Sequence, residues 1–583
     1  MNADGNILPL SGAADLSTIT ILADGEEIAL TIQVMSVTVI HEINRIPTAK
    51  LVLLDGDVSK QDFEVSNEDT FAPGTEIEIQ SGYHNNEDPI FKGLVVRHGL
   101  RTKAEGPSVL TVVCKDAAAK MTVGCNSAYF YDSTDSDVLE EIIGKNGLGA
   151  DVEATTVTHE NIVQYQCSDW DFLLMRAELA GMLVFVKSGT VAIKKPDPAQ
   201  GSKQTFVYGA TLINFEVEVD AEHQFQATST AGWDQSTQDL VETEGSDPGF
   251  PEQGDLEAAT LAEVLAPKDY HLHHTGNVGE GELQAWSDSL FVRSRLAKIR
   301  GRLTCQGFAE VDVGDVIELD GVGERFKGNA FIGAIRHDIT QGNWLAHMEI
   351  GVDPKWFHAK AKAEQPLAGG MLPAVEGLHI GVVTALEGDP MSDHRIRVRL
   401  PLIDSTEDGI WTRICTLDAG DGRGTVFRPE IGDEVIVGFL YGDPRQAIML
   451  GMLHSSKLPA HIEPSDDNHQ KAYMSRAGTE LMFDDEKPAC HIKLDSGRIV
   501  ELDDDAGTII CKDPDGNTIT LCSDGITLDS PKDITLKAGG DIKMEGINIE
   551  AKASAEFKAD GGAGSKLTSG AVTTVKGSAV MIN

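Results

Sequence analysis

The sequence predicts a mainly β protein with two β-barrels carrying inserted helices, an OB-type barrel, and a C-terminal β-helix or β-prism formed with other copies of the chain. Three observations predict this fold class. Short alternating apolar–polar segments recur over the first 350 residues, a second group fills about 75 residues within 378–456, and an eight-residue repeat follows residue 517. The 583 residues correspond to roughly three to five domains.

Residues 1–120 are predicted to form the first barrel. Segments with an apolar–polar period of two indicate strands, and turn pairs such as Asp55-Gly56 separate them. Evenly spaced short strands of this kind favour a barrel. The expected strands are Thr18–Leu22, Ile28–Val39, Ala49–Leu54, Gly74–Ile79, Ile90–His98 and Val109–Cys114.

Residues 121–200 are predicted to form an α/β insertion. Asp135–Gly144 has an acidic start, apolar residues at helical spacing and a glycine at its end, which together indicate a helix. Ser168–Gly181 shows the same pattern more clearly. Strands are expected to resume over Leu183–Val186 and Thr190–Ile193.

Residues 201–358 are predicted to form a second barrel of similar plan, interrupted by a long loop at 232–285. This interval is rich in Asp, Glu, Gly, Pro and Gln, which favours irregular structure, with one helix at Leu256–Leu265. A second helix is expected at Ala285–Arg300. The remaining strands are expected at Arg302–Phe308, Val316–Leu319, Ala330–Thr340 and Trp344–Ile350.

A linker rich in Ala, Lys, Pro and Gly is predicted at 359–376, followed by an OB-fold collar at 377–457. Residues 458–516 are predicted to form a neck and the start of a needle. The expected collar strands are Gly381–Leu386, Arg395–Leu400, Gly409–Ile414, Thr425–Phe427, Glu434–Leu440 and Ala447–Leu453.

Residues 517–583 carry the repeat that predicts the needle. Each repeat has two apolar residues separated by one residue, followed by Gly, Asp, Ser or Lys, as in 533–540. Such a short period is typical of a β-helix or β-prism. The predicted needle core is Ile519, Leu521, Ile526, Leu528, Ile534, Leu536, Ile542, Met544, Ile549 and Phe557.

The repeat also predicts oligomerisation. A strand of this type buries only one face, so a single chain exposes an apolar stripe and two open strand edges. Several chains wound around a common axis remove both problems, and each inward Ile, Leu or Val then contributes roughly 1.5–3 kcal/mol. The alternative is an ordinary antiparallel sheet, whose strands would be less regular in length.

The bulk charge excludes one class of partner. The net charge of −44 repels phosphate backbones, so nucleic-acid binding is not expected, and it disfavours docking on anionic lipid by charge. The eight cysteines include no C-x-x-C pair, which favours reduced thiols over a zinc ribbon or redox motif. No secretory signal and no apolar run near 18 residues is present, so the chain is expected to fold in the cytoplasm.

No catalytic residue, cofactor or metal site is predicted. The sequence contains no G-x-S-x-G, H-E-x-x-H, Walker or G-x-G-x-x-G match. His271 and His273 would share a strand face and could hold a metal, but no third ligand is evident, and a solvent loop is favoured. Asp513–Asn517 begins like a calcium loop but lacks the glycine and glutamate of that motif, so a tight turn is favoured.

Several segments in the expected order resemble the VgrG family of spike proteins. Val426–Gly451 (VFRPEIGDEVIVGFLYGDPRQAIMLG) resembles the OB-domain signature of that family, and Arg395–Pro401 and Trp411–Cys415 resemble the strands before it. Asp169–Gly181 is similar to the hub helix, and Ile90–Val95 to the strand that closes the first barrel. The resemblance covers nearly the whole chain.

The resemblance implies a structural homotrimer in a contractile injection machine, part of a particle delivered outside the cell or into a target cell. Two barrels per chain would match an Hcp-like hexameric tube, baseplate components would surround the hub, and effector cargo would travel with the spike. The needle would puncture a target membrane. A PAAR-type tip protein would dock on the predicted tip, namely Val580, Met581, Ile582 and Asn583.

The alternative from another class is a phage-type baseplate hub with cell-wall-degrading activity. Relatives of that kind carry a lysozyme domain between collar and needle. Only about 20 residues, from His454 to Tyr473, lie there in this chain, far fewer than a catalytic domain needs. The sequence therefore predicts a protein that is not an enzyme.

Overall fold

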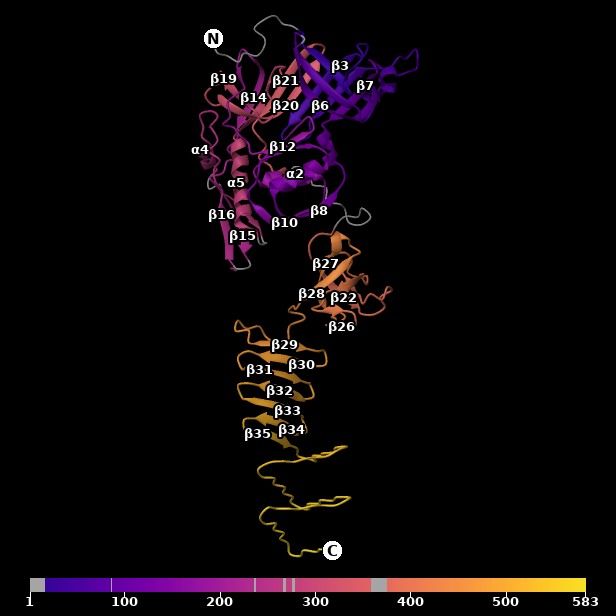
Figure 1. Cartoon of the computed structure of the whole chain (residues 1–583), viewed down its shortest axis with the longest axis vertical. Helices are drawn as coiled ribbons and strands as arrows, with labels where there is room; N and C mark the ends of the chain where they lie inside the picture. Colours follow the sequence, from indigo (N-terminus) through magenta and orange to yellow (C-terminus); the bar gives the residue numbers. More distant parts are fainter. Residues whose placement is uncertain are drawn as a thin grey trace. The chain divides into compact units, whose positions relative to one another are not determined.

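The computed structural model describes residues 16–84, 86–234, 237, 239–265, 269–274, 278–357 and 375–582. The chain divides into two compact units, residues 1–372 and 373–583. Strands dominate both units, as Figure 1 shows, and this confirms the predicted mainly β class.

The first unit is organised by one sheet of thirteen strands. Its strands, in sheet order, are β14 (Leu212–Val219), β18 (Ile299–Gln306), β21 (Asn343–Ile350), β20 (Gly328–Thr340), β3 (Val34–Glu42), β4 (Thr48–Leu54), β7 (Val109–Lys115), β6 (Asn86–Arg101), β5 (Glu76–Tyr83), β1 (Thr18–Ala23) and β2 (Glu26–Glu27). β19 (Val316–Asp320) branches from β20 and pairs with β13 (Gln204–Val207).

Two apolar cores lie against this sheet. One is built around Leu51, Leu110 and their neighbours, and the other around Phe206 and Met348. The sequence predicts two separate barrels for these halves. In the structure β20 pairs with β3, so the strands of both halves belong to one sheet that spans the two cores.

Most of the predicted strand positions in this sheet lie within about four residues of the observed bounds. The prediction of a strand over Ile28–Val39 is wrong in its first half, because the strand begins at Val34. The chain turns there instead: the Ile32 N–H donates to the Ala29 carbonyl at 2.9 Å, and Leu30 is almost fully exposed. The short helices α1 (Glu64–Asn67) and η1 (Asp69–Phe71) follow β4.

A third apolar core is formed by residues from η2 (Ala117–Thr122) to β12 (Thr190–Lys194). Its elements are β8 (Asn126–Thr134), α2 (Asp135–Lys145), β9 (Gly149–Val152), β10 (Thr158–Cys167), α3 (Asp169–Leu179), β11 (Leu183–Lys187) and β12 (Thr190–Lys194). Both helices start at a side-chain cap. Thr134 and Asp137 form a capping box on α2, and the Ser168 hydroxyl accepts from the Asp171 N–H at 3.0 Å on α3.

The interval predicted as a long loop contains a three-stranded sheet, so that prediction is wrong in part. Its elements are β15 (Ala227–Asp234), β16 (Asp239–Glu244), α4 (Ala258–Glu263) and β17 (Asp269–His274). The inner face of this sheet is polar, which hides the usual apolar alternation. Buried Thr228 and Thr230 donate to the carbonyls of Ser287 and Leu283 in α5 (Glu280–Leu296), at 2.9 and 2.6 Å. α5 begins five residues before the predicted Ala285.

The second unit begins with a closed barrel of five strands, which confirms the compact β collar. The strands in barrel order are β22 (His379–Ala385), β23 (Ile396–Arg399), β24 (Ile410–Ile414), β28 (Ala447–Met452) and β27 (Glu434–Phe439). The core includes Val398 and Val437. The prediction of a strand at Thr425–Phe427 is wrong, because these residues form no strand. A hairpin of β25 (Ala419–Gly420) and β26 (Arg423–Gly424) lies just before them. The short helix η4 (Leu440–Gly442) follows β27.

After the barrel the chain forms a seven-stranded antiparallel meander. Its strands in order are β29 (Gln470–Met474), β30 (Glu480–Asp484), β31 (Ala489–Lys493), β32 (Ile499–Asp503), β33 (Thr508–Lys512), β34 (Thr518–Cys522) and β35 (Gly525–Asp529). Residues 530–582 form no strand within this single chain. The predicted linker falls mostly on residues 358–374, outside the described ranges.

The sequence also leads to expectations about the cysteines and about membrane-spanning helices. All eight cysteines are free thiols. Within the described ranges, no helix combines the length and apolar character that crossing a bilayer requires.

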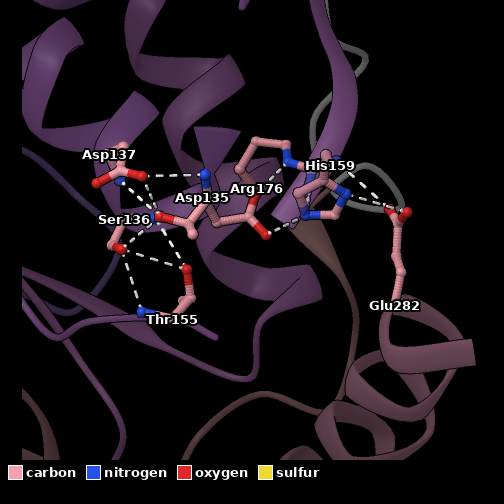
Figure 2. A network of polar contacts seen from close by, with 8 residues as sticks. Asp135, Ser136, Asp137, Thr155, His159, Arg176 and Glu282 are labelled. Carbon is pink, nitrogen blue, oxygen red and sulfur yellow. Dashed lines mark hydrogen bonds and ion pairs between the residues drawn. The ribbon is translucent and has the colours of Figure 1, made fainter. Parts of the chain in front are cut away.

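A buried ionic cluster joins the insertion to α5 (Figure 2). Asp135 at the start of α2 contacts His159 of β10 at 3.0 Å and Arg176 of α3 at 2.6 Å. Glu282 of α5 approaches His159 at 3.3 Å and Arg176 at 3.7 Å. Hydrogen bonds to Asp135 and then Glu282 raise the pKa of His159 from 6.5 to about 9. Two cations and two carboxylates therefore hold four elements, α2, β10, α3 and α5, together at neutral pH.

The raised pKa of His159 predicts a loss of stability at high pH. The contribution of the His159 proton to stability is complete just below pH 6.5 and is lost as the pH rises through about 9, because the folded protein then releases the proton. We expect about 1–3 kcal/mol to disappear over this range. Thermal unfolding of the full chain at pH 6.5 and pH 10 measures this loss, and His159→Gln should remove the cluster-specific part.

His271→Gln, on the strand β17, serves as the control and should retain the pH dependence of the parent. Equal pH dependence in the parent and His159→Gln would contradict the assignment.

Candidate assembly surface

Short polar turns define the meander. The Asp484 carboxylate accepts from the Glu486 and Lys487 N–H groups at 3.0 and 3.1 Å, and the bond from Lys487 is the main cause that lowers the pKa of Asp484. Asp513 accepts from the Asn517 side-chain amide at 2.9 Å, which lowers the pKa of Asp513. The predicted tight turn at Asp513–Asn517 is confirmed, because it joins β33 directly to β34. Such turns keep the strands five residues long.

The strand register places apolar residues on one face of the meander. Residues directly opposite each other in an antiparallel pair share a face, as do residues two apart in one strand. One row of opposed residues is Leu481, Ile492, Val500, Cys511, Ile519 and Leu528. The second row is Phe483, Cys490, Leu502, Ile509, Leu521 and Ile526. We call this surface the apolar face of the meander.

The opposite face is mostly polar. It presents Thr508 on β33 with Thr518 and Thr520 on β34, which lie between the residues of the apolar face. Near the collar, Glu480 meets His491 across β30 and β31 at 3.1 Å. The meander is therefore amphipathic across its thickness.

Most side chains of the apolar face are exposed in the described part of the single chain. Phe483 is 48% exposed and Ile509 is 41% exposed, although both lie in the middle of a paired sheet. Soluble monomers rarely expose a continuous apolar surface of this length. Full burial of each such side chain would contribute roughly 1.5–3 kcal/mol. The apolar face of the meander is the strongest candidate surface for association.

The predicted needle-core residues divide into two groups. Ile519, Leu521, Ile526 and Leu528 lie on the apolar face of β34 and β35. The other six lie beyond β35, and all are exposed in the single chain: Ile534, Leu536, Ile542, Met544, Ile549 and Phe557. The β-helix over these residues stays a prediction.

The predicted tip residues are also exposed. Val580 is 52% exposed, and Met581 and Ile582 are each 91% exposed. Asn583 lies outside the described residues.

The sequence predicts only a neck and the start of a needle for residues 458–516. Most of the apolar face lies in this range and is therefore not predicted. A signal for these strands is present. Pairs of apolar residues two apart recur at Leu481/Phe483, Cys490/Ile492, Val500/Leu502 and Ile509/Cys511, spaced by nine or ten residues. This spacing is longer than the eight-residue repeat, so a search for that repeat begins only at residue 517.

Two side-chain contacts join the collar to the first strands of the meander. The Phe427 ring lies 4.8 Å from the Tyr473 ring, centroid to centroid. Glu430 pairs with Arg476 at 2.8 Å. Both Phe427 and Glu430 belong to the segment that resembles the OB-domain signature, so that segment also contacts the start of the meander.

No metal centre emerges from the described residues. His271 and His273 share a face of β17 with ring centroids 6.5 Å apart, so the prediction of a solvent loop there is wrong. The Ser229 hydroxyl lies 2.5 Å from Nδ1 of His271. Across the ranges that the structure describes, no three His, Cys, Asp or Glu side chains gather as metal ligands would.

Two family models match the chain. The model described as the Alg8 N-terminal domain matches residues 13–341, which is more than half of the chain. The model described as the type VI secretion system/phage-baseplate injector OB domain matches residues 379–454, which contain the five-stranded barrel.

Curated relatives match over a shorter stretch. The type VI secretion system spike protein VgrG1b of Pseudomonas aeruginosa is 29% identical over 164 residues, covering 25% of this chain and 22% of the relative. The actin cross-linking toxin VgrG1 of Vibrio cholerae is 29% identical over 186 residues, covering 29% of this chain and 16% of the relative. The match thus spans about a fifth of the length of these relatives.

Solved structures include a 43 kDa tail protein of a Shewanella oneidensis prophage, with a TM-score of 0.45 and 11% identity, covering 58% of this chain and 98% of that one. The Francisella PdpA–VgrG complex has a TM-score of 0.39 and 10% identity, with coverage of 88% and 80%. Because the Alg8 N-terminal domain model matches more than half of the chain and an injector OB domain follows it, the chain belongs to the Alg8 N-terminal domain family and resembles VgrG-type spike proteins.

Proposed function

We propose that this chain is the structural hub and spike of a contractile injection machine and acts as a homotrimer. The observation that carries the proposal is the apolar face of the meander, which is continuous over six strands and uncovered in one chain. A face of this kind needs other copies to bury it. Three copies is the assembly that the resemblance to VgrG-type spike proteins implies.

In the proposed trimer, three meanders turn their apolar faces toward a common axis. Leu502 and Ile509 of each copy would then meet their equivalents in the interior, while Thr518 and Thr520 face solvent. The repeats beyond β35 would continue the same arrangement, with Ile534 and Leu536 turned inward. The result would be a rigid needle made of short strands and polar turns.

The first unit suits the role of a symmetry adaptor. Each chain contributes two apolar cores spanned by one sheet, so three chains would present six similar bodies to a hexameric tube of the Hcp kind. Baseplate components would surround this hub. Sheath contraction would drive the needle through a target membrane and deliver effector cargo as part of a released particle.

A substitution on the apolar face should prevent trimer formation. Ile519→Asp would place three carboxylates in the shared interior, where each unpaired charge costs several kcal/mol or must be protonated. We expect loss of the trimer and a lower unfolding temperature of the needle, measured by light scattering with size-exclusion chromatography and by thermal unfolding.

Thr520→Asp is the matched control, since Thr520 is the next residue on β34 and lies on the opposite face. It should stay trimeric with stability within about 0.5 kcal/mol of the parent. A stable monomer or dimer of the parent at micromolar concentration would overturn the proposed trimer.

The exposed apolar residues near 580 are proposed to dock a PAAR-type tip protein. Deletion of residues 579–583 should abolish capture of that protein and reduce injection, because Val580, Met581 and Ile582 would supply the apolar contact. Pull-down with the encoded tip protein measures capture, and light scattering should show an unchanged trimer. Capture at full yield would place the docking surface elsewhere.

A structural role also predicts the absence of catalysis. Purified trimer on a peptidoglycan zymogram should leave no clearing, with a lysozyme lane as positive control. Clearing by the chain would instead favour the phage-type hub that degrades cell wall.

A further inference from the structure

A buried ion pair links α3 to α5 at a second point, away from the His159 cluster. Glu178 of α3 contacts Arg293 of α5, and their side chains are only 5% and 9% exposed. The Ser289 hydroxyl of α5 also donates to the Glu178 carbonyl at 2.5 Å. A buried charge is tolerated only when it is paired and its remaining polar atoms are hydrogen-bonded. The remaining bonds of this pair therefore identify what the pair holds.

Those bonds go to the segment after β21. The Phe357 N–H donates to both carboxylate oxygens of Glu178, at 3.0 and 2.9 Å. Arg293 donates to the Lys355 carbonyl at 2.8 Å, and its guanidinium carbon lies 5.5 Å from the centre of the Trp356 ring. Three consecutive residues are thus fastened to the ion pair.

Residues 355–357 lie between the last strand of the first unit and the second unit. β21 ends at Ile350, and Phe357 is the last described residue of the first unit. The chain continues from there toward the second unit, which begins at residue 373. The last described residues of the first unit, from which the chain runs on toward the second unit, are therefore held by Glu178 and Arg293.

We propose that the Glu178–Arg293 pair is the anchor through which the first unit holds the connection to the spike. Force that reaches residues 355–357 along the chain would be passed to α3 and α5, which the His159 cluster joins a second time through Arg176 and Glu282 (Figure 2). This inference rests on the proposed function for its use in injection. The anchoring contact itself is independent of that function.

Two double variants separate anchoring from stability. Both remove the two charges, so both avoid an unpaired buried ion. Glu178→Gln with Arg293→Met keeps a carbonyl oxygen that accepts from the Phe357 N–H. Glu178→Met with Arg293→Met has no acceptor there. The two proteins differ by one side chain of similar size.

Hydrogen exchange of the peptide 353–357, measured by mass spectrometry on the full chain, reports the anchor. Phe357 lines an open groove of about 1200 Å³, so water reaches its surroundings and protection depends on the hydrogen bond. We expect exchange in the Met/Met variant to be at least tenfold faster than in the Gln/Met variant, with equal unfolding temperatures. Glu216→Gln with Arg302→Gln, an exposed pair 3.3 Å apart in the parent, is the control and should exchange like the parent.

Arg293→Lys adds a comparison for a case in which a double variant does not fold. It keeps the charge but loses the planar fork that reaches both Glu178 and Lys355, so exchange should rise above the parent. Equal protection of 353–357 in all folded variants would disprove the anchor. Faster exchange in a variant that still injects normally would support the anchoring contact but contradict its role in force transmission. A parent protein that assembles no injecting particle would contradict the proposed function and not the anchoring contact.

Discussion

The structure of the second unit depends on a sheet that has only one side suited to water. Strands of five residues with two apolar positions each cannot enclose a core, and the turns between them are too short to fold back as a cover. In the proposed trimer, the apolar residues on β30–β35 are buried by the other copies. The length of the strands, the polar turns and the threonines of the opposite face all agree with this single requirement.

The first unit meets a different requirement, which is to hold different cores together. The β3–β20 pairing does this with backbone hydrogen bonds, while α3 and α5 are joined by ions. Buried ion pairs often add little net stability, but removal of one partner leaves an unpaired buried charge that costs about 3–5 kcal/mol. In the proposed role, a body that presents a fixed shape to a tube and a needle gains more from defined geometry than from extra stability.

The sequence predicted the parts of the fold that depend on local pattern. The helix starts near Asp135 and Ser168 follow from the residues that favour helix N-termini, and most of the collar strands follow from alternation. It failed where a tertiary contact replaces the usual signal. Thr228 and Thr230 make a buried strand face out of polar residues because α5 supplies the acceptors. The full extent of the apolar face is not predicted, because the spacing of its apolar pairs changes from nine or ten residues to eight. The contact between Glu178 and Phe357 joins residues 179 positions apart, and no local sequence pattern links them.

The meander also has a consequence for how the protein is made. Each of its strands pairs with the next one along the chain, so sequence separations are short and the sheet can form quickly on each newly made copy. Association of the three copies in the proposed trimer is slower, because it depends on concentration. During that interval every folded copy carries an uncovered apolar sheet, which is the kind of surface that aggregates. The net charge of −44 repels other copies at long range, and this would keep unassembled chains apart until specific contacts form.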